Sequence, residues 1–169
     1  ITARMFPSAK VIAIEASPFM IVCGRRQNRD CVNLEFHHQL AENTYIPSNS
    51  IDTVTVTLLL HECSNEGKRN ILTEAYRILK PNGTIVLTDT PQTDLFTYRG
   101  FYEPWKHQWK DFNATKSLSN VGFVNIIDHG IVGGDGHVKS IEEHKETSVE
   151  STDNRLFVFT AMKKMKSSL

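Results

Sequence analysis

Hydrophobic and polar positions follow two different periods along this chain of 169 residues. Short apolar or alternating runs, typical of strands, are separated by segments in which apolar residues recur every three or four positions, as in helices. The expected strands are 10–14, 32–36, 52–60, 84–89, 123–128 and 155–162, and the expected helices are 18–29, 66–79 and one ending at Gly122. Strand and helix alternate in this order, which predicts a doubly wound α/β sheet.

The segment 72–89 predicts a helix that ends at a turn and is followed by a buried strand. Its apolar positions up to Leu79 keep helical spacing, Lys80 follows as a cation at the helix end, and Pro81 with Asn82-Gly83 stops the helix. The unbroken apolar run 85–87 comes directly afterwards. Such a run is typical of a parallel strand that is covered on both faces.

Composition and charge narrow the class of protein. Apolar residues make up 40% of the chain, and 19 basic residues balance 19 acidic ones, so we expect one domain over residues 1–169 and no nucleic-acid partner. No apolar run approaches the roughly 20 residues that span a bilayer, so no integral membrane segment is expected. Three cysteines without metal-ligand spacing favour reduced thiols, no metal site and a soluble intracellular protein, in the cytoplasm or an organelle. Lys163, Lys164 and Lys166 are expected to form a solvated tail.

The first expected strand ends in an acidic residue, Glu15. In open parallel sheets, ligands bind beyond the carboxyl ends of the strands. A carboxylate there can accept hydrogen bonds from both hydroxyls of a ribose, which predicts a ligand that contains a nucleoside. The alternative is an acid that caps the following helix or is merely exposed.

Three blocks, 11–20, 46–52 and 77–83, resemble the class I S-adenosylmethionine-dependent methyltransferases, in particular the small-molecule branch with the ubiquinone and menaquinone methyltransferases. The resemblance runs in order over residues 6–90 and is weaker over 123–128 and 155–162. It implies a Rossmann-like, mostly parallel sheet with an antiparallel last strand, and S-adenosylmethionine as the cofactor.

The resemblance also implies roles for particular residues. Glu15 would hold the ribose, and the adenine would lie between two groups of residues: Ala16, Ser17 and Met20 on one side, Leu40 and Ala41 on the other. The family often has an acidic residue where Leu40 stands, which contacts the adenine amino group, and this chain departs from that pattern. Val56 and Thr57 would line the methionine portion. His61 would lie near the transferred methyl group, as a general base or as a packing residue.

The segment 95–112 is rich in aromatic residues and is expected to form either a lid over an acceptor site or a helix packed on the sheet. The candidate acceptor-binding residues are Tyr98, Tyr102, Trp105, His107 and Trp109. An aromatic wall suits a small planar or lipophilic acceptor and could stabilise a sulfonium through its ring faces. Methyl transfer by direct displacement needs alignment more than a dedicated acid or base.

The chain departs from the family at its start. The family's first strand and glycine-rich turn have no counterpart before residues 10–14, so we expect an N-terminally truncated, inactive fragment of a longer enzyme. Two alternatives remain open. One is a methyltransferase-like binding or scaffold protein without activity. The other is a nicotinamide-dependent oxidoreductase, which also binds ribose through an acid after a strand but for which no Tyr and Lys pair at helical spacing is present.

Overall fold

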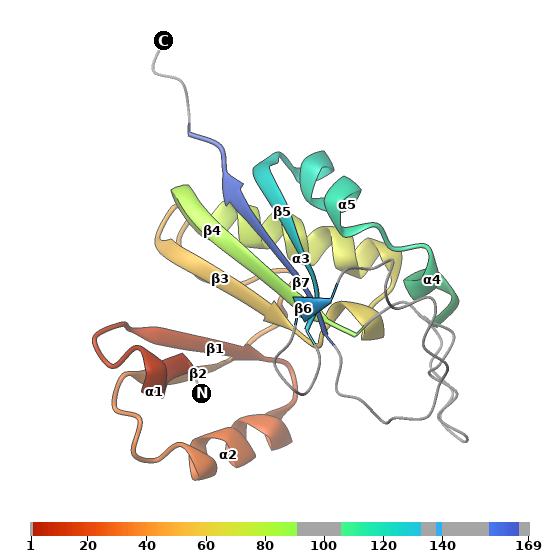
Figure 1. Cartoon of the computed structure of the whole chain (residues 1–169). Coiled ribbons are helices and arrows are strands. Elements are labelled where there is room, and N and C mark those ends of the chain that lie inside the picture. Colours follow the sequence, from red (N-terminus) through yellow and green to blue (C-terminus); the bar gives the residue numbers. More distant parts are fainter. Residues whose placement is uncertain (1, 91–105, 133–137, 140–155, 166–169) are drawn as a thin grey trace. The chain divides into compact units, whose positions relative to one another are not determined.

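The computed structural model describes residues 2–90, 106–132, 138–139 and 156–165 (Figure 1). Its contacts divide the chain into two compact units, Ile1–Tyr45 and Ile46–Leu169, and each unit is described by itself. The expectation of one domain over 1–169 stays a prediction. Residues 95–105 of the expected lid lie outside the described residues.

The first unit is a parallel strand pair with its connecting helix. Its elements are α1 (Thr2–Met5), β1 (Val11–Glu15), α2 (Pro18–Gln27) and β2 (Leu34–His38). β1 and β2 pair in parallel from Val11 opposite Leu34 to Glu15 opposite His38, so their carboxyl ends lie side by side. The Ser17 hydroxyl accepts a hydrogen bond from the Met20 N–H and Pro18 occupies the first turn, as expected for the start of α2.

β2 begins two residues later than predicted, and Asn33 gives the reason. Its backbone carbonyl accepts the Val11 N–H, and its side-chain amide donates to the carbonyls of Ala3, Phe6 and Ala9 at 2.9–3.1 Å. The Asn33 side chain therefore fastens the segment before β1 to the start of β2.

The second unit is a mixed sheet with helices. Its elements are β3 (Ile51–Thr57), η1 (Leu60–Glu62, a 3₁₀ turn), α3 (Asn65–Ile78), β4 (Leu79–Asp89), α4 (Lys106–Lys110), α5 (Ala114–Val121), β5 (Phe123–Val132), β6 (Val138–Lys139) and β7 (Leu156–Lys163). The strand order is β3-β4-β7-β5-β6. The β3 and β4 strands are parallel, and β7 is antiparallel to both of its neighbours, as predicted for the last strand.

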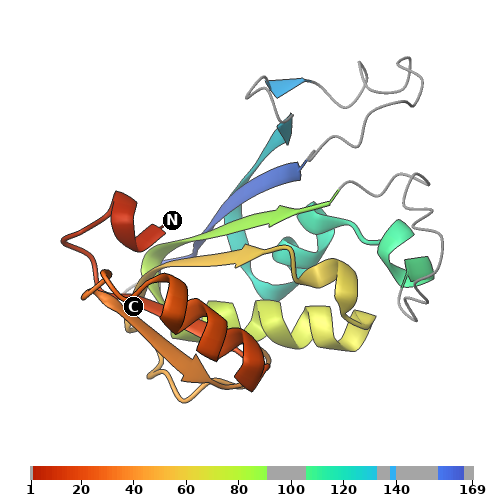
Figure 2. The same cartoon turned by 90° about the horizontal axis from the view of Figure 1, so that it is seen from below.

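Helices α3 and α5 lie side by side on one face of this sheet (Figure 2). Between them and the strands lies the core, whose most buried apolar side chains are Leu60, Leu72, Leu79, Ile85, Leu87 and Leu118. α5 ends as predicted at Gly122, which takes the left-handed conformation (φ 109°) that a side chain would make costly.

The helix stop at residues 79–83 differs from the prediction in one respect. β4 begins at Leu79, directly after α3, so the expected turn is an irregularity within the strand. Asn82 takes a left-handed φ of 64°, and the pairing with β3 jumps from Ile51 opposite Leu79 to Thr53 opposite Thr84. Burial alternates along β4, with Ile85 and Leu87 buried and Val86 only partly buried, so the prediction of a strand covered equally on both faces is not met.

Two further expectations were wrong. β3 ends at Thr57 instead of residue 60, because Leu58 takes a φ of 50° and the chain turns into η1. Lys163 is not part of a solvated tail, since it is buried in β7. Among the described residues no helix is long and apolar enough to span a membrane.

Candidate functional site

The carboxyl ends of β1 and β2 gather the predicted ribose and adenine residues of the first unit. Oε1 of Glu15, the last residue of β1, accepts the Ser17 N–H at 2.8 Å, which fixes the carboxylate beside the start of α2. The Glu15 carbonyl accepts the N–H of Gln39, the residue before Leu40. The Met20 and Leu40 side chains are 54% and 60% exposed. This end of the strands therefore presents a carboxylate that can accept hydrogen bonds and two exposed apolar side chains.

His38 also belongs to this end of the strands, and sequence reasoning did not assign it. Its Nε2 lies 2.8 Å from the Ala16 carbonyl, so an Nε2–H would donate to that oxygen. The contact ties the end of β2 to the residue after Glu15. The signal was present in the sequence as a polar residue at the end of a strand, but only the strand pairing shows which residue it meets.

The second unit presents Val56 and Thr57 at the carboxyl end of β3. Val56 is buried and Thr57 is exposed. The next residue, Leu58, donates its N–H to the Thr88 carbonyl at 2.8 Å while holding its left-handed φ. Such a conformation costs a residue with a Cβ atom roughly 1–2 kcal/mol. It turns the chain sharply, so that His61 comes to the end of the neighbouring strand β4.

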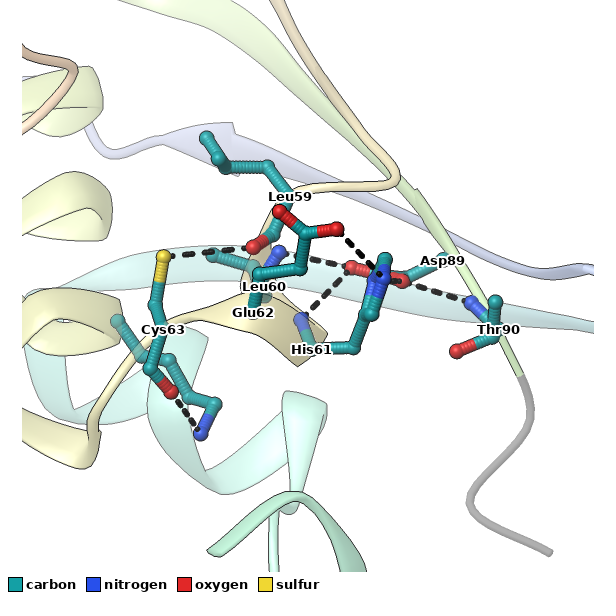
Figure 3. A network of polar contacts seen from close by, with 8 residues as sticks. Leu59, Leu60, His61, Glu62, Cys63, Asp89 and Thr90 are labelled. Atoms are coloured by element: carbon teal, nitrogen blue, oxygen red, sulfur yellow. Dashed lines mark hydrogen bonds and ion pairs between the residues drawn. The ribbon is translucent and has the colours of Figure 1, made fainter. Parts of the chain in front are cut away.

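His61 forms a short contact with Asp89, the last residue of β4 (Figure 3). Nδ1 of His61 lies 2.6 Å from Oδ1 of Asp89. The Asp89 carboxylate also accepts three backbone N–H groups, from Leu60 at 2.9 Å, His61 at 3.3 Å and Thr90 at 2.7 Å. Asp89 therefore accepts the first two N–H groups of η1 and is also the partner of the imidazole.

Two further charged side chains, Glu62 and Lys68, lie near the His61 and Asp89 pair, one exposed and one buried. Oε1 of Glu62 lies 3.6 Å from Nε2 of His61, and the Glu62 side chain is 68% exposed, whereas that of Asp89 is 2% exposed. On α3, the buried Lys68 ammonium donates to the Cys63 carbonyl at 2.7 Å. Burial lowers the pKa of Lys68 from its ordinary value, and the nearby Cys63 and Asp89 partly offset this.

One aromatic side chain, Trp109, contacts the His61 ring and belongs to an aromatic cluster. The Trp109 ring centroid lies 6.2 Å from that of His61, edge to face, and Trp109 stacks on Phe112 and Phe157 at 5.0 and 5.7 Å. Trp109 is 6% exposed, and its indole Nε1 has no hydrogen-bond partner within the described part of the chain. Of the other predicted acceptor residues, His107 lies in α4, and Tyr98, Tyr102 and Trp105 fall outside the described residues.

A cavity of about 550 Å³ lies between α3 and α5. Its lining includes Lys68, Tyr76 and Lys116 but none of the predicted site residues. Across the described ranges, no group of three or more His, Cys, Asp or Glu side chains could hold a metal ion.

Comparisons with known proteins find methyltransferases that are similar to this chain. Residues 1–83 match the family described as "Methyltransferase domain". A demethylmenaquinone methyltransferase of a Geobacillus species is 31% identical over 98 residues, which are 57% of this chain and 41% of that protein. A mitochondrial 2-methoxy-6-polyprenyl-1,4-benzoquinol methylase of Schizosaccharomyces pombe is 35% identical over 82 residues, covering 45% of this chain and 26% of that protein. The chain thus spans less than half the length of these relatives.

Solved structures extend the likeness over the whole chain. A SAM-dependent methyltransferase of Methanosarcina mazei has a TM-score of 0.65 at 17% identity, covering 98% of this chain and 88% of that one. The N-methyltransferase NodS of Bradyrhizobium japonicum has a TM-score of 0.64 at 12% identity, covering 97% and 79%. At these identities the likeness shows the fold.

Proposed function

We propose that the protein transfers a methyl group from S-adenosylmethionine to a small acceptor, because its first 83 residues match a methyltransferase domain and the chain is similar to quinone methyltransferases. The observation that carries this proposal is the Glu15 carboxylate at the end of β1, within the matched residues 1–83. It is fixed by one backbone N–H, and its geometry suits an acceptor of hydrogen bonds from a ribose.

The surroundings of Glu15 fit the cofactor of this family. When bound, S-adenosylmethionine supplies an electrophilic methyl group on a positively charged sulfur. Glu15 would accept from the ribose hydroxyls, and the exposed Met20 and Leu40 side chains offer apolar surface to the adenine, along with Ala16, Ser17 and Ala41. Val56 and Thr57 would line the methionine portion.

We propose an aromatic or lipophilic acceptor of the quinone type. This follows the names of the relatives, a demethylmenaquinone methyltransferase and a benzoquinol methylase. Tyr98, Tyr102, Trp105, His107 and Trp109 would contact it, and His61 would accept its proton. Support for the last role comes from the side chain of His61, which is 19% exposed and firmly held by Asp89.

Binding of S-adenosylhomocysteine tests the cofactor assignment. With the full-length protein we expect calorimetry to detect binding, and Glu15→Ala to weaken it by roughly 1.5–3 kcal/mol, since a hydrogen bond to a charged group is lost. This corresponds to a Kd increase of about 10-fold to 150-fold.

Glu35→Ala is the matched control. Glu35 is an acid on the neighbouring strand β2, exposed and paired with Lys10, and its loss should leave the Kd unchanged. Binding of a nicotinamide cofactor in place of S-adenosylhomocysteine would contradict the proposal and favour an oxidoreductase. Equal Kd values for wild type and Glu15→Ala would contradict the role of Glu15.

A further inference from the structure

The cavity of about 550 Å³ between α3 and α5 has no part in the proposed function. Its volume lies within the roughly 300–1,000 Å³ that sites for small molecules have. The buried or half-buried part of its lining, called the floor below, is apolar and partly aromatic: Leu72, Tyr76 and Phe112. Amide and hydroxyl side chains from both helices lie around this floor: Asn65, Thr73, Asn113, Ser117 and Asn120.

Three cations and one acid also line this cavity. Arg69 on α3 and Lys116 on α5 are exposed, and so is the acid, Asp111. Among the described residues no ion pair involves any of these three side chains. The third cation, Lys68, is 2% exposed and donates to the Cys63 carbonyl at 2.7 Å. The lining therefore carries a net positive charge, and two of its cations are open to a ligand.

Helices α3 and α5 run in the same direction along the cavity. At one end, the ammonium of Lys68 in the first turns of α3 lies 6.0 Å from the centre of the Phe112 ring, just before α5 begins. At the other end, a Cβ atom on Gly122, directly after α5, would lie 3.4 Å from the hydroxyl of Tyr76 near the end of α3. The positive poles of both helices thus lie at one end and add to the charge of the cations.

We propose that this cavity binds a small organic carboxylate, whose charged group meets Arg69 and Lys116 and whose apolar ring or chain lies on the floor. A guanidinium presents two N–H groups to one carboxylate, and the ammonium adds a point charge. Contact with the floor removes apolar surface of the ligand from water, which favours binding. Asp111 lies in the same lining, so a single negative charge fits better than the double charge of a phosphate monoester. The proposal does not depend on methyl transfer.

Three probes separate the charge of the ligand from its apolar part. In ¹H–¹⁵N NMR titrations of the full-length protein, 3-phenylpropionate should bind with a Kd below about 1 mM. The Kd of 3-phenylpropanamide, which has the same shape without the charge, should be at least about ten times higher, and acetate, which lacks the ring, should bind more weakly than both. Equal Kd values for the acid and the amide, or no binding of the acid at about 10 mM, would overturn the proposal.

Substitutions at the exposed charges test where the carboxylate lies. Arg69→Gln and Lys116→Gln should each raise the Kd of 3-phenylpropionate at least about threefold, and Asp111→Asn should lower it, because opposite charges attract and like charges repel. Arg26→Gln on α2 and Lys164→Gln after β7 are the matched controls, since both residues are exposed and neither lines the cavity. An unchanged Kd in Arg69→Gln and in Lys116→Gln would overturn the proposal.

The same titrations distinguish this cavity from the proposed acceptor site. We expect the largest shift changes at amides of α3 and α5 that line the cavity, such as those of Tyr76 and Asn120. Saturation with S-adenosylhomocysteine should leave these changes in place. The largest changes at His61 and Trp109 would instead assign the probe to the proposed acceptor site and overturn the inference, while the proposed function would stand.

Discussion

Lys163 closes the end of a helix from a distant strand. Its ammonium donates to the carbonyls of Tyr76 and Leu79 and to the Asn49 side chain, each at 2.7 Å, and it lies 4.8 Å from the centre of the Tyr76 ring. The last carbonyls of a helix have no partner within the helix and carry its negative pole. Lys163 in β7 satisfies this end of α3.

Replacing Lys163 by Met should therefore destabilise the fold. We expect the free energy of unfolding to fall by about 2 kcal/mol, because hydrogen bonds to a charged group are lost and buried carbonyls stay unpaired. Urea unfolding measures the change. The neighbouring Lys164 is exposed, and Lys164→Met serves as the control with no change expected. Equal stability of the two variants would contradict the role of Lys163.

Lys68 makes stability depend on pH. Burial lowers its pKa in the folded state, so between the folded and the ordinary pKa the unfolded chain binds more protons than the folded one. Stability should then rise with pH across that interval. We expect this slope to be smaller in Lys68→Met, as measured by urea unfolding from pH 7 to pH 10, and an unchanged slope would contradict the assignment.

At the scale of elements, the close approach of β3 and β4 depends on a residue without a side chain. A Cβ atom on Gly83 would lie 2.8 Å from the Lys80 carbonyl oxygen and 3.0 Å from that of Asp52, both backbone atoms that cannot move away alone. The irregularity at Asn82 and Gly83 is what lets β4 follow α3 without a loop.

Gly83→Ala should lower the free energy of unfolding by roughly 1–3 kcal/mol, as other overpacked sites do. Gly67 provides the comparison, since it lies within α3, where alanine is favoured over glycine by roughly 0.5–1 kcal/mol. Thermal unfolding should move in opposite directions for the two variants. An unchanged or raised melting temperature in Gly83→Ala would show that Gly83 is not constrained by its neighbours.

At the scale of the whole molecule, burial is distributed unequally between the two units. Every side chain below 2% exposure in the described ranges lies within residues 46–169, whereas the buried apolar residues of the first unit are Ala3 and Ile21. Local stability follows buried apolar contacts. The unit that carries Glu15 is therefore the less stable one.

Hydrogen exchange should show this difference. We expect the amides of β1 and β2 to exchange at least about ten times faster than those of β4 and β7, because opening the first unit exposes little apolar surface. Saturation with S-adenosylhomocysteine should slow exchange in β1 and α2. Equal protection of β1 and β4 without ligand would contradict the expectation.

The sequence by itself determined what depends on local order. The sequence predicted α2 and α3 to within about two residues and the end of α5, since helix ends are set by neighbours such as Ser17, Pro18 and Gly122. The position of Glu15 at the end of an apolar strand predicts a ribose partner, and this stays a prediction. These features involve residues that are close along the chain.

Only the tertiary structure decided what depends on distant residues. His61 and Asp89 are 28 positions apart, and their contact exists because β3 and β4 pair in parallel and a left-handed Leu58 turns the chain at the end of β3. Lys163 became a buried helix cap for the same reason, since the strand that carries it pairs with β4. No local sequence pattern predicts these contacts, because strand pairing brings together residues that are far apart along the chain.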